Sequence, residues 1–435
     1  MENRRALIDE LIDAAVASVQ PENFIPRVVK VEGSSAVIGG TACDFSSFDR
    51  VYTAAVGKAA VGMTEALDRL IGDHVTEGIV LAKHVPERTS LPAKYRVMNG
   101  GHPVPTEDSV RGGQAVLELL KRARTNDLVI FLISGGGSAL MTAPINGIDL
   151  ATYQRFNAQI LGCGADIKEF NTLRKHLDAV KGGRLAQAAA PAKQITIILS
   201  DVVGSPVDII ASGPTVPDPG TFADAARIIE KYSGGTEFPK EIVDTIRLGC
   251  EGKLPETLKA EDPAFANSEI ILAAENRTAA YAAARKGREL GLDAQVINTR
   301  VTGEASRIGA LLPSFFSEMK RPGLLVFGGE TTVHIHGNGL GGRNLETALG
   351  AVRGMAEYPN CALVTLATDG EDGPTDAAGA IVTSDTLSTA LAAGLTPEEF
   401  LQNNDSYHFF EKAGILLRPG STGTNVNDLT FLLAF

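Results

Sequence analysis

The sequence alternates along almost its whole length between short runs rich in β-branched and apolar residues and longer stretches with helical periodicity. This alternation predicts parallel strands joined by crossover helices, because parallel neighbours need a long connection between them. We expect a first set of strands at residues 50–56, 77–81, 95–98, 128–133 and 194–199. We expect a second set at residues 269–273, 293–297, 324–327, 332–336, 362–367 and 430–435. The main expected helices cover residues 4–19, 109–122, 171–185, 277–290 and 344–355.

Residues 233–266 lie between the two sets and are rich in glycine and proline. This composition is typical of a linker, here built around one short helix at residues 240–248. A chain of 435 residues is long enough for two hydrophobic cores. We therefore expect two α/β domains, residues 1–250 and 251–435, with mostly parallel sheets and helices on both faces.

Composition and charge exclude several classes of protein. The net charge of −12 argues against nucleic-acid binding, which requires a basic surface. No apolar run approaches the roughly 20 residues of a membrane span. The four cysteines form no CxxC pair and are expected to be small buried hydrophobic residues. We expect a cytoplasmic enzyme that acts on small molecules, with neither a nucleic-acid nor a membrane partner, and the sequence leaves a homo-oligomer open.

Ligands of such sheets lie beyond the carboxyl ends of the strands, where two loops of the first half stand out. Lys58 follows the strand at residues 50–56 and suits a phosphoryl group as a point charge, although no GxxxxGK[ST] pattern precedes it. Three glycines that can wrap an anion follow the strand at residues 128–133. This phosphate-binding loop consists of Ser134, Gly135, Gly136, Gly137 and Ser138. Ser138 is not in a GxSxG elbow, which disfavours a hydrolase nucleophile.

Further candidates in the first half are charged. Asp201 follows the strand at residues 194–199 and could bind a metal, act as a base or cap a helix. The expected helix at residues 171–185 is basic and contains Arg174 and Lys181. These side chains either line a crevice for an anionic ligand or form a solvated face, and the sequence leaves both open.

In the second half, an apolar strand leads to Glu330, and a glycine loop at residues 337–342 precedes Arg343 at the expected start of a helix. Backbone N–H groups around Gly339 and Gly341, together with the guanidinium, predict a site for a small anionic group. The loop formally matches GxGxxG, but without a convincing βαβ unit a dinucleotide site is disfavoured. His334 and His336 have no third ligand nearby in the sequence, which disfavours zinc.

Two polar turns complete the set. Asp369 comes directly after the strand at residues 362–367 and is the expected ligand for Mg²⁺ or for a substrate hydroxyl, whereas the acids that follow it are expected to be solvated. Asn425 could present its amide to a substrate, while Asn427 and Asp428 are expected to shape their turn.

An ordered set of motifs closely resembles the glycerate 2-kinase family, also called class II glycerate kinases, whose second half carries the MOFRL pattern. The motifs are VGKA at residues 56–59, NGGHPVP at 99–105, SGGGSA at 134–139, RKHL at 174–177, KGG at 181–183, LSDV at 199–202, GGET at 328–331, GGRN at 341–344, TDG at 368–370 and GTN at 423–425. They cover nearly the whole chain and occur in the family's order. Members have often been named hydroxypyruvate reductases.

The resemblance implies an ATP- and Mg²⁺-dependent kinase that phosphorylates D-glycerate at its 2-hydroxyl, with the active site in a cleft between two domains. It places the catalytic lysine and the key arginine on Lys58 and Arg343, with Asp201 as a further site acid. The supporting positions fall on Glu330, Asp369 and Asn425. Two alternatives stay open, an NAD(P)H-dependent hydroxypyruvate reductase and a non-catalytic protein that binds anions. Neither spacing nor composition separates a 2-hydroxyl from a 3-hydroxyl, or the general base from the metal ligand.

Overall fold

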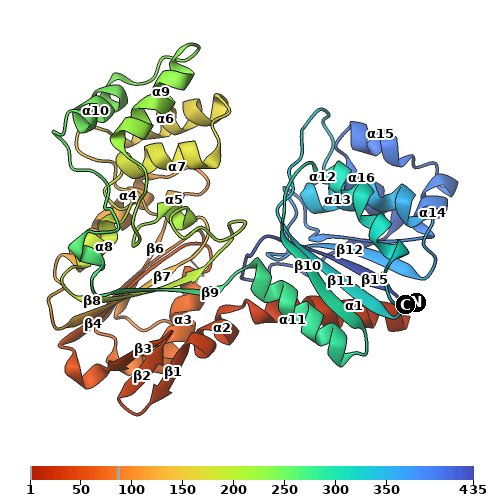
Figure 1. Cartoon of the computed structure of the whole chain (residues 1–435), viewed down its shortest axis with the longest axis horizontal. Coiled ribbons are helices and arrows are strands. Elements are labelled where there is room, and N and C mark those ends of the chain that lie inside the picture. The colour runs from red at the N-terminus through yellow and green to blue at the C-terminus, as the bar shows by residue number, and fades with distance from the viewer. Residues whose placement is uncertain (1, 86–88) are drawn as a thin grey trace. The chain divides into compact units, whose positions relative to one another are not determined.

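The computed structural model describes residues 2–85 and 89–435 and consists of two compact units (Figure 1). The N-unit contains Phe24–Ser200 and Ser205–Ala273, and the C-unit contains Met1–Asn23, Asp201–Gly204 and Ala274–Phe435. The N-terminal helix thus belongs to the same unit as the C-terminal half. The expected domain boundary near residue 250 stays a prediction.

The N-unit is built on a six-stranded sheet in the order β6-β5-β4-β7-β8-β9. Its central strands read as continuous apolar runs because both faces of the sheet are covered by helices, and β7 is buried throughout. The pairs β4–β5, β5–β6, β4–β7 and β7–β8 are parallel. The strands are β4 (Arg50–Val56), β5 (Glu77–Ala82), β6 (Tyr95–Asn99), β7 (Asp127–Ile133), β8 (Lys193–Leu199) and β9 (Ser268–Ala274). The sheet's helices include α3 (Ala60–Ile71), α4 (Glu107–Leu120), α5 (Gly137–Leu140) and α8 (Arg184–Ala189).

A three-stranded antiparallel meander of the N-unit was not expected. It consists of β1 (Val29–Glu32), β2 (Ser35–Ile38) and β3 (Thr41–Asp44), and follows α2 (Pro21–Val28). Each hairpin has a two-residue connection that starts with a glycine at positive φ, Gly33 and Gly39. Gly-Ser and Gly-Gly connections of this length are hairpin signals, so the meander was visible in the sequence.

A cluster of helices completes the N-unit and corrects two expectations. It consists of α6 (Leu150–Gly162), α7 (Ile167–His176), α9 (Phe222–Ser233) and α10 (Lys240–Cys250). The expected helix at residues 171–185 is wrong, because α7 ends at His176 and Gly182 and Gly183 adopt positive φ before α8. The helix expected at residues 240–248 is confirmed, but its surroundings are no free linker, since Ile242 and Ile246 pack into the apolar core of this cluster.

The C-unit contains a mixed six-stranded sheet in the order β10-β11-β15-β12-β13-β14. Strands β10 and β11 are parallel, whereas β15 lies between β11 and β12 and is antiparallel to both. The strands are β10 (Asp293–Val301), β11 (Gly323–Gly329), β12 (Cys361–Ala367), β13 (Gly379–Thr383), β14 (Leu416–Leu417) and β15 (Asp428–Ala434). The strand expected at residues 332–336 is wrong, because apart from one bridge at Thr332 this segment is an irregular loop.

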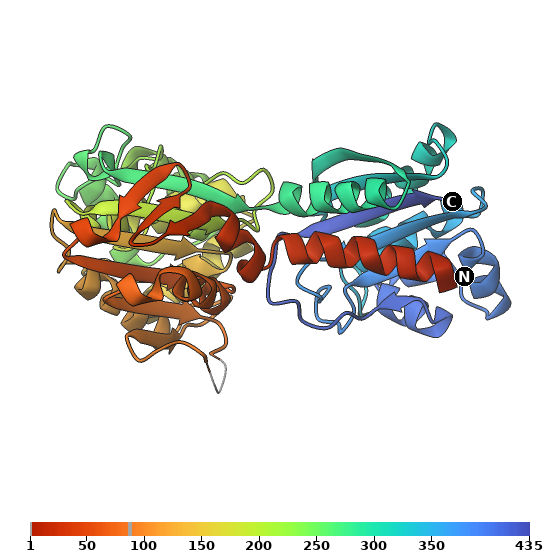
Figure 2. The same ribbon diagram turned by 90° about the horizontal axis from the view of Figure 1, so that it is seen from below.

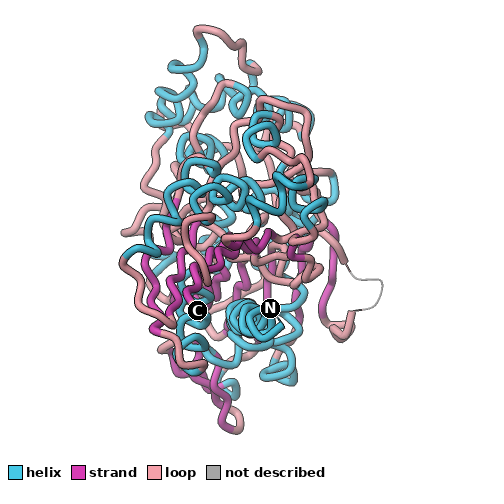
Figure 3. Tube along the Cα trace, turned by 90° about the vertical axis from the view of Figure 1, so that its right-hand side faces the viewer, coloured by secondary structure: helices cyan, strands magenta, loops and turns pink. Residues whose placement is uncertain are grey.

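Helices cover this sheet as the α/β class requires, and the predicted class is confirmed. The expectation of a mostly parallel sheet does not hold for the C-unit, because β11–β15, β12–β15, β12–β13 and β13–β14 pair antiparallel. Figure 2 shows α1 (Glu2–Ser18) running beside α11 (Asn276–Glu289), and Figure 3 shows α1 end-on beside the strands. Helix α13 (Arg343–Met355) packs against β12 and β13 and against α12 (Ala305–Leu311). The remaining helices are α14 (Thr386–Ala392), α15 (Pro397–Gln402) and α16 (Ser406–Ala413).

Candidate functional site

The chain order of the N-unit sheet creates a crevice at the carboxyl ends of its central strands. From β4 the chain builds β5 and β6 to one side and then returns to place β7 on the other side of β4. The helices that follow β4 and β7 therefore leave in different directions, and parallel sheets bind their ligands at such a switch point. Val56 pairs with Ile133, so the loops that carry Lys58 and Ser134 start at the same level.

These two loops are fastened to each other. The backbone N–H of Lys58 donates to the carbonyl of Gly135 (2.9 Å), and the N–H of Ala59 donates to Oγ of Ser134 (3.1 Å). Gly57 has φ +129°, and a Cβ there would lie 2.1 Å from the Ser134 hydroxyl, so only glycine permits this approach. The Lys58 side chain remains exposed. The structure thus brings Lys58 together with the loop at residues 134–138, and phosphate binding by this loop stays a prediction.

A cavity of about 770 Å³ opens beside this loop within the N-unit. Gly136 and Ser138 line it from the loop, Arg174 from α7, and His102 from the segment after β6. Burial and the neighbouring charges of Lys58, Lys83 and Arg174 lower the pKa of His102 to about 4, so the imidazole is neutral at pH 7. Ser138 also exchanges a hydrogen bond of 2.8 Å with Ser212. His102 lies in the motif at residues 99–105 but is not among the site residues expected from the sequence.

Arg174 and Lys181, expected on one helix, lie in different surroundings. The Arg174 guanidinium stacks on the ring of Phe170 at 4.8 Å and faces the cavity. Lys181 is 1% exposed and donates to Asp178 (2.7 Å) and to the carbonyl of Met141 (2.8 Å). Burial lowers the pKa of Lys181 to about 8, although Asp178 opposes the shift. The structure therefore shows a buried ion pair at Lys181, and its expected role in substrate binding stays a prediction.

In the C-unit, strand register explains why acids and an arginine converge. Gly329 at the end of β11 and Ala367 at the end of β12 both pair with Asp428, the first residue of β15. The residues after β11 and β12, including Glu330 and Asp369, therefore emerge beside Asp428. Asp201 follows β8 in the chain, and its contacts group it with the C-unit.

Arg343 starts α13 and binds two of these carboxylates. Its Nε donates to Asp428 (2.6 Å), its Nη2 donates to the second oxygen of Asp428 (3.2 Å), and its Nη1 donates to Glu330 (2.8 Å). Burial alone would lower the pKa of Arg343, but the charges of Asp428 and Glu330 raise it overall. Burial raises the pKa of Asp428, and the guanidinium opposes the shift. The expectation that Asp428 only shapes its turn is wrong, because it is the bidentate partner of Arg343.

Asp369 and Asn425 are also joined, since the Asn425 amide donates to Oδ2 of Asp369 (3.0 Å). The oxygen of the same Asn425 amide accepts from the N–H of Asn427 (2.9 Å), which fixes the orientation of the side chain. Asp369 lies close enough to Asp428 for its charge to raise the pKa of that carboxyl. Glu330, Arg343, Asp369 and Asn425 thus form one polar cluster around Asp428.

The glycine loop at residues 337–342 is held by the protein itself. The N–H groups of His336 and Gly337 donate to Oδ1 of Asn404 (2.7 and 3.0 Å), and the N–H of Gly339 donates to the carbonyl of Asn403 (2.9 Å). A Cβ at Gly341 would lie 2.2 Å from the hydroxyl of Ser406. Close packing against residues 403–406 therefore accounts for these glycines, and anion binding by Gly339 and Gly341 stays a prediction.

The start of α13 is capped by a carboxyl group of the same chain, that of Asp372. Asp372 accepts from the N–H groups of Asn344 (3.0 Å) and Leu345 (2.7 Å), and its side chain is buried. Burial raises the pKa of Asp372 to about 7, although these N–H groups oppose the shift. Asp372 is thus a helix cap, and the expectation that it is a solvated turn acid is wrong.

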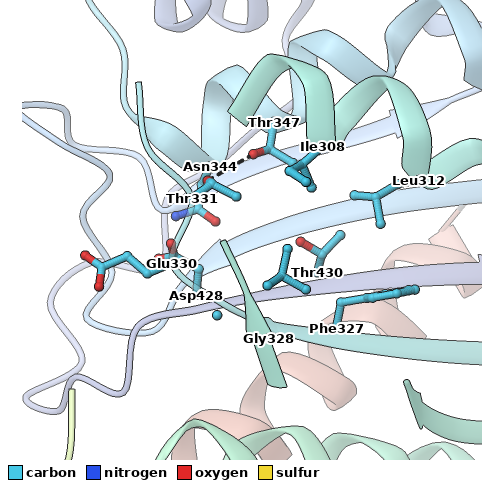
Figure 4. Close-up of a pocket in the computed structure, with 12 residues that line it drawn as sticks. Ile308, Leu312, Phe327, Gly328, Glu330, Thr331, Asn344, Thr347, Asp428 and Thr430 are labelled. Atoms are coloured by element: carbon cyan, nitrogen blue, oxygen red, sulfur yellow. Dashed lines mark hydrogen bonds between the residues drawn. The ribbon is translucent and has the colours of Figure 1, made fainter. Parts of the chain in front are cut away.

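A small cavity of about 20 Å³ lies behind the polar cluster (Figure 4). Glu330, Asn344 and Asp428 lie toward one side of it, and Leu312 and Phe327 toward the other. The volume allows little more than one water molecule, so this cavity cannot hold a substrate.

Comparison with known proteins decides the family. The model described as a domain of unknown function, DUF4147, matches residues 7–247, and the MOFRL family model matches residues 323–428. A protein of Thermotoga maritima named D-glycerate 2-kinase is 41% identical over 390 residues, which cover 88% of this chain and 90% of that protein. The chain belongs to the glycerate 2-kinase family. A glycerate 2-kinase of Pyrococcus horikoshii is 39% identical over 431 residues, which cover 97% of this chain and 96% of that protein.

Solved structures of the glycerate 2-kinase family share the fold. A crystal structure of a glycerate kinase from T. maritima matches with a TM-score of 0.88 and 37% identity, and the match covers 100% of both chains. The resemblance expected from the ordered motifs is therefore confirmed. None of the helices within residues 2–85 and 89–435 has the length and apolar character needed to cross a bilayer.

Proposed function

We propose that the protein is an ATP-dependent kinase that phosphorylates D-glycerate at its 2-hydroxyl, giving 2-phosphoglycerate and ADP. The observation that carries the proposal is the similarity to a D-glycerate 2-kinase over 88% of the chain. It is supported by two groups of polar residues at strand ends, around Lys58 in the N-unit and around Arg343 in the C-unit. Both groups present a cation, as the transfer of a phosphoryl group requires.

In this reaction the glycerate hydroxyl oxygen forms a bond to the γ-phosphorus, and the bond from that phosphorus to the β-γ bridging oxygen breaks. The catalytic groups must align the reactants and neutralise charge, and no covalent intermediate with the protein is needed. We assign the Lys58 ammonium and the Arg343 guanidinium to the charges of the γ-phosphoryl group and of the glycerate carboxylate. Asp201, Glu330 and Asp369 are the acids proposed to accept the hydroxyl proton or to bind Mg²⁺.

Magnesium fits this proposal as an ion that binds together with the nucleotide. Among the described residues, no group of three or more His, Cys, Asp and Glu side chains could hold a metal ion. Mg²⁺ is commonly bound by one or two carboxylates together with substrate phosphates, and Asp369, oriented by Asn425, suits that role. When bound, the ion neutralises charge on the β- and γ-phosphate oxygens.

The test is a coupled assay of ADP formation with D-glycerate, with ³¹P NMR to separate 2-phosphoglycerate from 3-phosphoglycerate. Lys58→Met removes the ammonium but keeps the length of the side chain, and we expect a fall in kcat of about 100-fold or more. Lys240→Met is the matched control, because the side chain of Lys240 is 85% exposed and pairs only with Asp244 of its own helix in the described part of the chain. Absence of glycerate-dependent ADP formation, or rapid NAD(P)H oxidation with hydroxypyruvate, would overturn the proposal.

A further inference from the structure

The N-unit cavity has a chemical character that glycerate cannot use. Its walls are largely apolar, and two of its apolar side chains, Val104 and Leu161, are 56% and 54% exposed. The other apolar lining residues are Pro103, Pro105, Ala139, Ala151, Ala158 and Phe170. Its volume of about 770 Å³ lies in the range of ligand sites, roughly 300–1,000 Å³. A small, highly polar three-carbon acid would leave most of this surface in contact with water.

Two residues that line the cavity each carry a buried polar atom without a partner among the described residues. The Asn157 side chain, on α6, is 8% exposed, and its Oδ1 has no hydrogen-bond partner among the described residues. Arg174 is also 8% exposed, and its Nε has no partner within the same ranges. Burial of an unpaired acceptor and an unpaired donor is unfavourable, so a ligand that draws these two side chains toward the cavity and supplies the missing groups gains from both. Such a ligand carries a donor N–H and an acceptor oxygen.

The cavity also reaches the phosphate-binding loop. Gly136 lines the cavity, and a Cβ built at Gly136 would lie 3.3 Å from Cγ of Lys58 and 3.1 Å from Cδ2 of His102. The Lys58 side chain therefore starts beside the cavity lining. A ligand in the cavity can extend its anionic part toward this loop.

We propose that this cavity binds the adenosine part of ATP, with Asn157 as the residue that selects adenine. The exocyclic amine of adenine donates to Oδ1 of Asn157, the base and ribose cover the apolar wall, and an oxygen of the nucleotide accepts from Nε of Arg174. Guanine presents an oxygen acceptor where adenine presents its amine, so it leaves Asn157 unpaired. The inference rests on the proposed kinase function, because the nucleotide that it places in the cavity is the ATP of that reaction.

The experiment measures the binding of ADP and GDP to the whole protein by calorimetry without glycerate, so that it does not depend on turnover. Asn157→Leu removes the acceptor at similar volume. For this variant we expect the Kd for ADP to rise by about 10-fold or more, while GDP binding and the KM for glycerate stay unchanged. A raised KM for glycerate with unchanged ADP binding would assign the cavity to the acid and overturn the proposal. Unchanged values for both ligands would also overturn it.

A second pair of variants avoids any change in the core. Leu161→Glu places a carboxylate at the exposed rim of the cavity and should weaken ADP binding by about 10-fold, because the cavity loses apolar surface and gains charge of the same sign as the phosphates. Ile167→Glu is the matched control, because Ile167 is 58% exposed and lies outside the cavity. Equal ADP affinities for the two variants would contradict the proposal. Wild-type protein that binds ADP in this way but forms no phosphoglycerate would refute the kinase activity while leaving the nucleotide site in place.

Discussion

Arg343 combines a structural and a proposed catalytic role in one guanidinium. Its fork makes two hydrogen bonds to Asp428 and one to Glu330 while the side chain remains 33% exposed. A planar guanidinium can hold a carboxylate in this bidentate way, whereas an ammonium offers only a point charge. The two roles can therefore be separated by a substitution that keeps the charge and removes the fork.

We expect Arg343→Lys to lower kcat by about 100-fold and the free energy of unfolding by about 1–3 kcal/mol, because Asp428 is 7% exposed and would lose its bidentate partner. Steady-state kinetics and urea unfolding measure the two effects. Arg353→Lys is the control, since Arg353 also makes a bidentate pair, with Glu398, but its side chain is 56% exposed. That variant should change stability by less than about 0.5 kcal/mol. Equal effects of the two substitutions would show that the fork at Arg343 has no special role.

The sequence predicts Arg343, Glu330 and Asp369 as site residues because each follows a strand or starts a helix. It does not predict the part that Asp428 plays, because Asp428 stands at the start of its strand and not at the end. Only the antiparallel insertion of β15 between β11 and β12 brings the start of one strand to the ends of the other two. The sequence also does not predict the unpaired atoms of Asn157 and Arg174, because whether a polar atom has a partner depends on the residues around it in the folded chain.

At the scale of elements, the glycine loop at residues 337–342 depends on Asn404. The Asn404 amide accepts from the N–H groups of His336 and Gly337, and it donates to the carbonyl of His334 and to Glu346 (3.1 Å each). Asn404 itself has φ +51°, a conformation that asparagine and glycine adopt more readily than other residues. One side chain thus fixes both ends of the segment at residues 334–337.

We expect Asn404→Gly to lower the free energy of unfolding by about 2–3 kcal/mol, because glycine accepts the backbone angle but leaves these partners unsatisfied. Amide hydrogen exchange of residues 334–342 should become faster than in the wild type. Asn360→Gly is matched in backbone conformation, with φ +59°, and its exposed side chain accepts only from Arg4 among the described residues. A loop with unchanged exchange in Asn404→Gly would mean that glycine packing alone holds it.

The elements that the sequence predicts well are those with long, uniform patterns. The apolar runs at β4, β7 and β8 and the periodic helices α11 and α13 lie within a few residues of their expected bounds. The errors occur where glycine has a local role. Helix α7 ends at His176, and Gly182 and Gly183 adopt positive φ where the expected helix would continue. Gly33 starts a hairpin in a region to which no strand was assigned. The alternating run at residues 332–336 resembles a strand, but its N–H groups at His334 and His336 bind side chains instead of a neighbouring strand.

At the scale of the whole molecule, the sequence predicts two α/β parts, but it does not specify the neighbours of two segments. Strand β9, expected with the second set, hydrogen-bonds at the edge of the first sheet. Helix α1, first in the chain, packs on α11 of the C-unit. Both segments have partners that are distant in the sequence, which residue patterns alone do not specify.

The N-unit buries histidines whose pKa is lowered, whereas the C-unit buries carboxyl groups whose pKa is raised. The stabilities of the two units should therefore respond to pH in opposite directions. In the N-unit, burial lowers the pKa of His102 to about 4 and lowers that of His176. The unfolded chain binds these protons first as pH falls below about 6.5, so the N-unit gains stability as pH rises from about 4 to 6.5. In the C-unit, burial raises the pKa of Asp372 to about 7 and also raises that of Glu346. The folded C-unit holds these protons longer than the unfolded chain, so it loses stability as pH rises from about 4 to 7.

Native-state hydrogen exchange, read by peptide and corrected for the intrinsic exchange rate, should therefore show the N-unit opening less readily at about pH 7 than at about pH 5.5, and the C-unit more readily. His102→Gln should reduce the pH dependence of the N-unit alone, and Asp372→Asn that of the C-unit alone, because each substitution removes one buried group whose pKa differs between the folded and the unfolded chain. The same direction of change in both units, or a C-unit whose pH dependence survives Asp372→Asn undiminished, would contradict the assignment of these buried groups. The opposite trends would also mean that the stability of the whole molecule changes little between these pH values. A rise in pH stabilises the N-unit while it destabilises the C-unit, so the two effects offset each other.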